Sequence, residues 1–507
     1  MAQQLQNITV AAPGFMGLNT QESPIGGDPS FASVADNCVI DKLGRIGARK
    51  GWEAVSSNGA AVLGSSRGIE AVFEFVKRDG TKIVFSAGNN KIFTGTSTLA
   101  AVTLPGGYSI SANNWKIVSF NNDVYFFQRG HAALVSVAGS TTLIAVADGG
   151  TAAPAANEVL AAYGRLWAAD ITANKYVVYW SDLLDGDDWH GGSSGSLDLT
   201  LVWPTGFDEV VALSAHNGFL IIFGKKSMIV YSGAAAPASM TLSDTIEGIG
   251  CIARDSVQHT GADILFLSDT GVRSLGRTIQ EKSLPLNDLS KNVRTDLTSL
   301  VPLQTNAIKS LYSADEAFYL LTLPDSDTTY CFDMRSPLQD GSQRATTWSG
   351  LHPLAFTTTE AGDIYFGLSS GIVKYSGYLD GTANYQMRYF SNPMDFGNAS
   401  NLKFLKKFNI TIIGGQNTNS TLNWGYDYST NFTKQVFTLT GSVNAGEYGV
   451  SEYNTTAEYT ATAIINTPKV NTSGSGEIVT IGIETEINDT AFSIQKIDIH
   501  ALLGRLI

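Results

Sequence analysis

A hairpin unit that recurs along the chain constrains the fold more strongly than any other feature of the sequence. Each copy has an apolar strand rich in aromatic and β-branched residues, a tight turn of Gly, Asn, Asp or Ser, and a second strand that often ends in Tyr or Phe. Seven copies can be recognised, and their first strands contain Ile83, Val124, Leu166, Phe219, Ile264, Phe318 and Ile364. The interval from each copy to the next matches the length of one blade of a β-propeller.

We therefore predict an all-β fold with a β-propeller over residues 61–384. Seven blades are counted, and six result if the first copy is a flanking element. A β-sandwich or a solenoid would also form hairpins at regular intervals, although a solenoid would repeat over a shorter interval.

The composition changes after the last copy. Residues 385–507 are rich in Asn and Thr and contain alternating strand patterns, one of them at 455–465. We expect an antiparallel β domain there, most simply a sandwich. Residues 1–60, rich in Gly, Pro and Asn, are expected to form an extended N-terminal arm.

One segment, residues 284–303, departs from the strand pattern. Its apolar residues Leu289, Val293, Leu297 and Leu300 fall on one face of a short helix, which Asp288 could cap. We expect a helix inserted between two blades, and the alternative is a helix that docks a partner.

The charge and cysteine content exclude several classes of protein. With 33 Lys and Arg against 46 Asp and Glu, the net charge is −13, which argues against a protein that binds nucleic acid through a basic surface. Cys38, Cys251 and Cys331 are far apart, so we expect neither a disulfide framework nor a cysteine-rich zinc site. This cysteine content favours a reducing compartment. No export signal and no apolar run long enough for a membrane span are visible, so no membrane insertion is expected.

Motifs of catalysis are missing from the sequence. It has no HExxH, no GxSxG, no P-loop and no Asp box of the sialidase type, and its six histidines (His131, His190, His216, His259, His352 and His500) are scattered. We therefore expect no enzyme, no cofactor and no metal. The C-terminal carboxylates Asp427, Glu452, Glu484 and Glu486 could form a hydrolytic pair only in the general sense that any exposed acids could.

Acidic residues are densest at Asp182, Asp185, Asp187 and Asp188. Such a loop could offer oxygen ligands to Ca²⁺, but it lacks EF-hand spacing, and Asp and Gly also form turns in plain blade connections. The triplets at Asn409, Asn431 and Asn454 would be glycosylation acceptors in a secretory protein, and here we interpret them as part of an Asn/Thr-rich surface.

Positive charge is locally in excess at Arg45, Arg49 and Lys50. These residues are our candidates for an assembly contact with an acidic neighbouring subunit, through paired Arg and carboxylate groups. The alternative is a solvated turn.

Several stretches together resemble one family. Residues 14–24 and 33–52, then 179–189, 219–233 and 246–275, are similar to the tail nozzle, or packaged-DNA stabilisation, proteins of short-tailed bacteriophages. The resemblance covers about residues 14 to 380 of the chain, and it departs from the family at Arg49-Lys50-Gly51, where Arg-Pro-Gly is usual.

The resemblance implies a structural virion protein of the phage tail, assembled in the host cytoplasm. Family members are propellers that form a homohexameric ring in the tail tube, below the head–tail connector, where they retain the packaged genome and conduct DNA during ejection. The implied partners are further copies of the chain, connector and adaptor proteins, and tail fibres, while double-stranded DNA passes without specific binding. The alternative function is a carbohydrate-binding or carbohydrate-cleaving propeller associated with a tail.

Overall fold

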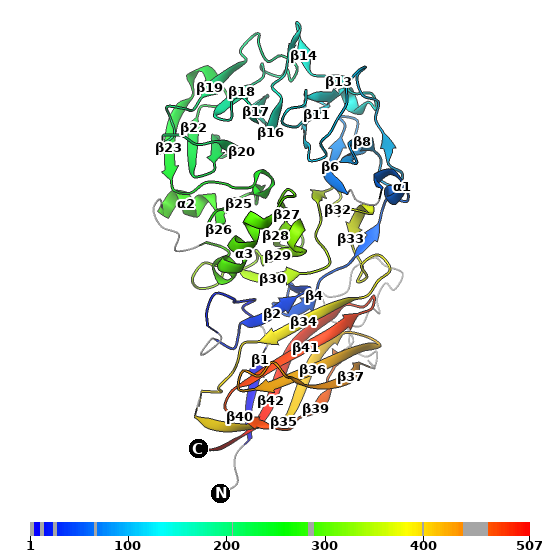
Figure 1. Ribbon diagram of the computed structural model, residues 1–507, viewed down its shortest axis with the longest axis vertical. Helices are drawn as coiled ribbons and strands as arrows, with labels where there is room; N and C mark the ends of the chain where they lie inside the picture. Colours follow the sequence, from blue (N-terminus) through cyan, green and yellow to red (C-terminus); the bar gives the residue numbers. More distant parts are fainter. Residues whose placement is uncertain are drawn as a thin grey trace.

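The computed structural model describes residues 5–10, 15–23, 28–64, 68–204, 206–281, 288–397, 400–439 and 465–506. It has two parts, a propeller and a β-sandwich beside it (Figure 1). The strand expected at 455–465 lies almost entirely outside the described residues. The prediction of an all-β chain with a β-propeller and a C-terminal antiparallel β domain is confirmed.

Each of the seven predicted hairpins forms two strands of a separate sheet in the ring. Five of these are separate four-stranded sheets, a sixth blade is formed by the first four strands of a nine-stranded sheet, and one sheet has three strands in the described chain. The first two blades comprise β6 (Ile69–Val76), β7 (Lys82–Gly88), β8 (Lys91–Thr94) and β9 (Ala100–Ala101), then β10 (Lys116–Phe120), β11 (Asp123–Phe127), β12 (Leu134–Ser136) and β13 (Ile144–Ala145). The next two comprise β16 (Ala156–Ala162), β17 (Arg165–Ile171), β18 (Val177–Trp180) and β19 (Gly195–Asp198), then β20 (Val210–His216), β21 (Phe219–Gly224), β22 (Ser227–Ser232) and β23 (Thr241–Glu247).

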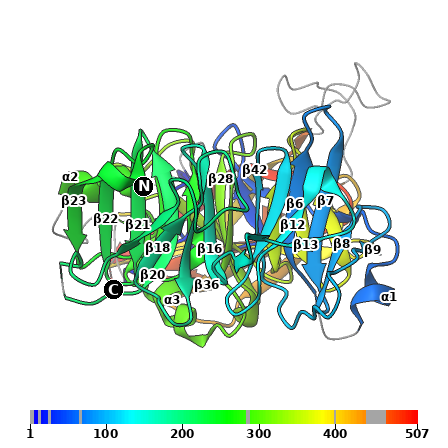
Figure 2. The same cartoon turned by 90° about the horizontal axis from the view of Figure 1, so that it is seen from above.

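The three-stranded sheet and the last two blades complete the ring. The sheet contains β24 (Gln258–His259), β25 (Ile264–Ser268) and β26 (Gly271–Ser274). The blades contain β27 (Lys309–Ser313), β28 (Phe318–Leu323), β29 (Thr328–Asp333) and β30 (Arg344–Trp348), then β31 (Ala355–Thr358), β32 (Ile364–Leu368), β33 (Gly371–Tyr375) and β5 (Trp52–Ala54). A small hairpin of β14 (Ala147–Asp148) and β15 (Thr151–Ala152) joins the second and third blades. Figure 2 shows the strands side by side, with α1 (Gly59–Leu63) and α2 (Leu275–Glu281) at opposite edges.

Strand burial and turn conformation explain why these segments form blades. Strands β21, β25 and β28 are almost entirely buried, as expected for strands that are covered by a neighbouring sheet on each face. Tight turns need left-handed backbone, which Asn and Gly supply at Asn217 and Gly218, with φ of 50° and 82°. The hairpin repeat therefore reflects turn chemistry and burial that act over short stretches of sequence.

The C-terminal part is a sandwich of two sheets that share one apolar core. One sheet contains β2 (Ala32–Asp36), β34 (Tyr385–Ser391), β41 (Val479–Ile487), β36 (Thr418–Tyr426) and β37 (Thr433–Leu439). The other contains β1 (Leu5–Val10), β3 (Cys38–Ile40), β4 (Ile46–Ala48), β42 (Phe492–Leu506), β35 (Asn401–Gly414), β38 (Ile465–Asn466), β39 (Lys469–Asn471) and β40 (Ser475–Gly476). Phe408, Ile410 and Ile499 from one sheet pack in the same core as Tyr389 and Ile483 from the other.

The described part of the segment 1–60 is extended, as expected of an arm, but its strands belong to the other two regions. β2 lies between β30 of the propeller and β34 of the sandwich, with Asp36 opposite Thr347. Because of this insertion, one sheet of nine strands runs from a propeller blade into the sandwich. β5 pairs with β33 and completes the last blade.

The helix expected at 284–303 is shorter than predicted. α3 (Arg294–Leu300) forms after a 3-10 turn at Lys291–Val293, and Leu289, Val293 and Leu297 are buried, so the predicted apolar face is confirmed. Asp288 does not cap it: the N-cap residue is Val293, and the Asp288 carboxylate instead accepts a bond from Arg294 Nε. Residues 284–287 lie outside the described residues.

The three cysteines are buried free thiols. Among the described residues, no helix combines the length and the apolar character that a bilayer crossing requires.

Candidate functional site

Buried and half-buried charged residues from several blades meet at the axis of the propeller. The first strands of neighbouring blades contact each other round the ring, and they bring together Lys116 on β10, Glu158 on β16 and Lys309 on β27. Arg254 and Asp255 join them from the 3-10 turn Arg254–Ser256, which precedes β24. We call these five residues the axial charge cluster.

Asp255 and Arg254 are the centre of the axial charge cluster. Arg254 Nε donates to Asp255 Oδ1 at 3.0 Å, and its Nη2 donates to Oδ2 at 2.8 Å. The same guanidinium reaches the Asn157 carbonyl at 2.6 Å and Asn114 Oδ1 at 3.0 Å. Lys309 Nζ donates to Asp255 Oδ2 at 2.8 Å. Hydrogen bonds from one charged turn therefore tie three blades to the three-stranded sheet.

The environment shifts the pKa values within this cluster in opposite directions. Burial disfavours the Asp255 carboxylate, but Arg254 and Lys309 outweigh burial and hold its pKa well below the usual range. Burial raises the pKa of Glu158, which Lys116, 3.4 Å away, only partly offsets. Burial also lowers the pKa of Lys309.

A cavity of about 200 Å³ opens beside the cluster. Its lining includes Glu70, Lys116, Asp255, Gln258 and Lys309. The charged groups that face the cavity form ion pairs with one another or hydrogen bonds with side-chain amides. For example, Asn113 Nδ2 donates to Glu70 Oε1 at 3.4 Å. We interpret the cluster as a set of cross-links that holds the blades together at the axis.

The candidate assembly residues lie at the junction between propeller and sandwich. Arg49 is fully buried, and its guanidinium makes two bonds with the Asp380 carboxylate, of 2.8 and 2.7 Å, and one of 2.8 Å with Asn37 Oδ1. Its charged centre also lies 4.1 Å from the centre of the Tyr385 ring. Burial disfavours this guanidinium, yet Asp380 outweighs burial and raises its pKa.

Arg45 and Lys50 also find acidic partners within the chain. Arg45 is buried and donates from Nε to Asp41 Oδ2 at 2.6 Å, and half-buried Lys50 donates to Glu316 Oε1 at 2.8 Å. The hypothesis that Arg45 and Arg49 contact an acidic neighbouring subunit is corrected by these positions, because their guanidinium groups are buried against carboxylates of the same chain. Lys50, with 30% of its side chain exposed, is the accessible member of the three.

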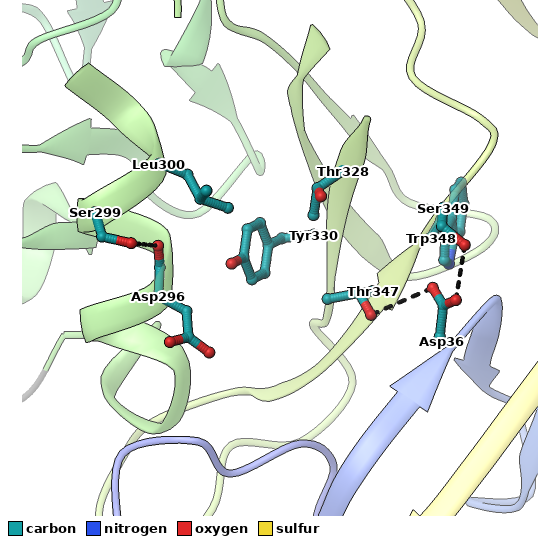
Figure 3. Close-up of a pocket in the computed structure, with 9 residues that line it drawn as sticks. All are labelled: Asp36, Asp296, Ser299, Leu300, Thr328, Tyr330, Thr347, Trp348 and Ser349. Carbon is teal, nitrogen blue, oxygen red and sulfur yellow. Dashed lines mark hydrogen bonds between the residues drawn. The ribbon is translucent and has the colours of Figure 1, made fainter. Parts of the chain in front are cut away.

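A pocket of about 320 Å³ lies between α3, the propeller strands β29 and β30, and β2 (Figure 3). Its lining is Asp36, Asp296, Ser299, Leu300, Thr328, Tyr330, Thr347, Trp348 and Ser349. Figure 3 shows Tyr330 projecting into the space between α3 and β30, with Asp296 on the helix side and Asp36 on the opposite side.

The acidic loop at 182–188 is organised by bonds to its own backbone. Asp188 Oδ1 accepts N–H bonds from His190 and Gly191, and Asp182 Oδ1 accepts one from Ser193. Of the four acids, Asp188 comes near other possible metal ligands, since its carboxylate lies within 4.8 Å of ligand atoms of Asp148 and His190. The hydrogen bonds are those of exposed turns, which favours the interpretation as a blade connection.

The remaining candidates stay dispersed. Asp427 accepts two backbone N–H bonds, Glu484 accepts from Asn423, and Glu486 accepts from Asn384, while Glu452 and Asn454 lie outside the described residues. Among the histidines, His500 contacts Asn409 at 2.7 Å and His352 contacts Asp327 at 2.5 Å.

Sequence reasoning missed the axial charge cluster and the junction pocket. The members of the cluster come from separate blades, between positions 116 and 309 of the sequence, so no spacing motif joins them. A signal was nevertheless available at Glu158, which precedes an apolar run inside β16, where a charge needs a partner. Lys116 and Lys309 are the first residues of their strands and gave a weaker signal.

Comparison with known proteins gives structural likeness alone. No protein-family model matches the chain, and no curated protein matches it in sequence. The computationally designed Ika8 protein is 13% identical over 72% of this chain and 98% of its own, with a TM-score of 0.37. BamB from Moraxella catarrhalis is 10% identical over 60% of this chain and 84% of its own, with a TM-score of 0.37.

A third solved structure is PorZ, an essential bacterial surface component of the type-IX secretion system of Porphyromonas gingivalis. It is 13% identical over 64% of this chain and 37% of its own, with a TM-score of 0.34. All three TM-scores lie below 0.5, so these likenesses carry no argument about function. The description of the propeller rests on the strand pairing of the chain itself.

Proposed function

We propose that the chain is a structural subunit of a phage tail, which assembles as a homo-oligomeric, hexameric ring below the connector, retains the packaged genome and conducts DNA during ejection. The sequence resemblance over about residues 14 to 380 suggests this role. The proposed partners are other copies of the chain, connector and adaptor proteins, and tail fibres. The role requires neither catalysis nor a cofactor.

The continuous nine-stranded sheet is the observation that carries the proposal. A subunit that withstands the force of packaged DNA has to transmit load between its parts without a hinge. Here β30, β2 and β34 are joined by backbone hydrogen bonds, and the buried Arg49–Asp380 pair lies beside them. Domains of one chain usually meet through polar interfaces that allow relative motion. Here the propeller and the sandwich share a sheet instead, although β2 meets β30 at one bridged pair, Asp36 opposite Thr347.

Contacts between copies need a surface, and apolar side chains are exposed on adjoining turns of two blades. Leu183 and Leu184 are 51% and 62% exposed, and Phe219 is 37% exposed. The Leu184 N–H donates to the Gly164 carbonyl, and the Tyr163 hydroxyl donates to the Phe219 carbonyl, so these turns lie together. Exposed apolar groups that gather in this way are typical of interaction surfaces. We name Leu183, Leu184 and Phe219 the rim patch and propose that a second copy covers it.

The test measures the mass of the purified full chain in solution and images the particles by negative-stain electron microscopy. We expect rings of six copies, and Leu184→Asp should shift the mass towards the monomer. Leu303→Asp is the matched control and should leave the ring intact, because Leu303 is 64% exposed but lies in the 3-10 turn Val301–Leu303, outside the rim patch.

A monomer at all concentrations would overturn the proposal. So would turnover of a polysaccharide that Asp or Glu substitutions abolish, because it would favour the carbohydrate-cleaving alternative.

A further inference from the structure

The pocket at the junction between propeller and sandwich contains polar groups without protein partners. The hydroxyl of Tyr330 has no hydrogen-bond partner among the described residues, although the residue is only 2% exposed. Asp296, on α3, is an exposed residue at the edge of the pocket, and its carboxylate has neither an ion pair nor a hydrogen bond with any described residue. Because the pocket reaches this hydroxyl, a ligand that enters it can form a hydrogen bond with Tyr330 without displacing a protein partner.

The other polar groups of the pocket limit what such a ligand can be. The Thr328 hydroxyl already donates to the Ser326 carbonyl at 2.8 Å, and the Ser299 hydroxyl donates to the Asp296 carbonyl at 2.7 Å. The Ser349 hydroxyl donates to Asp36 Oδ2 at 2.7 Å. Each of these oxygens retains only acceptor capacity towards the pocket, so a well-matched ligand is rich in hydrogen-bond donors.

The carboxylates that line the pocket indicate which kind of hydrogen-bond donor fits it best. Asp36 is paired with Arg388 at 2.7 Å, whereas Asp296 on the opposite side of the pocket has no cationic partner among the described residues. A cation gains more from an unpaired carboxylate than a neutral polyol does, because hydrogen bonds between charged groups are the stronger ones. Leu300 and the Tyr330 ring supply an apolar wall for the methylene groups of such a cation.

We propose that this pocket binds an organic cation, an alkylammonium or guanidinium group, through the Asp296 carboxylate and the Tyr330 hydroxyl. Its volume of about 320 Å³ lies at the lower end of the range of small-molecule sites and suits a side chain or a small amine. The group comes either from a free amine or from a Lys or Arg side chain of a second copy. The inference does not depend on the proposed ring.

The test uses isothermal titration calorimetry on the full chain with agmatine, which carries both cationic groups, and with D-glucose as a neutral polyol of similar size. We expect agmatine to bind and glucose not to bind. Asp296→Asn should weaken agmatine binding about tenfold or more, because it removes a charged hydrogen bond. Tyr330→Phe should weaken it without lowering the thermal stability of the ligand-free protein, because the hydroxyl it removes has no partner.

The control variant is Glu247→Gln on β23, which removes one negative charge from a distant blade and should leave binding unchanged. Unchanged agmatine binding in both pocket variants would overturn the proposal, as would no detectable agmatine binding or binding of glucose with the same dependence on Asp296 and Tyr330.

A second measurement identifies the source of the cation. If a second copy supplies it, saturating agmatine should dissociate the assembly seen by sedimentation velocity. If the occupant is a free amine, the assembly should be unaffected. A monomer that binds agmatine would support the pocket and overturn the ring, so the two proposals fail independently.

Discussion

Asp255 holds two cations of the axial charge cluster at once, since its carboxylate accepts bonds from Arg254 and Lys309. Asp255→Asn would leave these buried cations without their counter-charge, and we expect the free energy of unfolding at pH 7 to fall by about 3 kcal/mol. Urea unfolding checks this, with Asp269→Asn in an exposed turn as the control, for which a change within about 0.5 kcal/mol is expected.

The loss of stability caused by Asp255→Asn should depend on pH. Because the folded pKa of Asp255 lies below its unfolded value, its contribution is present above the unfolded pKa of about 3.9 and is lost as the pH falls through the folded value. The difference in free energy of unfolding between the parent protein and Asp255→Asn should therefore be largest near neutral pH and should disappear at acidic pH. A gap that widens on acidification would contradict the assignment. Glu158 is present in both proteins, so its own titration largely cancels.

Arg49 and Lys50 are adjacent in sequence but differ in what they support. Arg49→Ala removes one partner of a buried ion pair and should cost about 3 kcal/mol, whereas Lys50→Ala breaks a half-exposed pair and should cost less than about 1 kcal/mol. Thermal denaturation of the two variants gives the comparison. Equal costs would show that the junction does not depend on the Arg49–Asp380 pair.

Among the elements, β5 closes the ring, and it passes very close to a neighbouring loop. A Cβ at Gly51 would lie 1.9 Å from the Leu379 carbonyl oxygen, so Gly51→Ala has to displace either β5 or that loop. We expect a clear fall in the melting temperature, with the last blade losing its outer strand. Gly106→Ala, where a Cβ would meet nothing within 4 Å, is the control and should be neutral or slightly stabilising. Equal melting temperatures would contradict this role of β5.

The elements also show what the sequence can predict. The seven hairpins were predictable, because a turn such as Asn217-Gly218 lies directly between the two apolar strands that it joins. The pairing of β2 was not predictable. Its partners β30 and β34 lie in the second half of the chain, and nothing in the residues of β2 indicates which strands they pair with. For the same reason Arg49 resembled a surface charge until Asp380 was known to lie beside it.

At the scale of the whole molecule, net charge should govern assembly. Each copy carries a net charge of −13, so copies repel one another when salt is low. Raising the salt from about 10 to 150 mM shortens the Debye length from about 30 to 8 Å, and we expect the proposed ring to become more stable. Sedimentation velocity at the two concentrations measures this. Assembly that weakens with salt would instead indicate attraction between oppositely charged faces.

The position of β2 and β5 also has a consequence in time. As the chain is synthesised, these strands emerge early, but β33 and β34, with which they pair, emerge only after most of the propeller has been made. At elongation rates of about 5–20 residues per second, the wait is on the order of tens of seconds. A nascent chain therefore cannot close its last blade or join its two parts until translation has passed Ser391, and the residues made first are among the last to find their places.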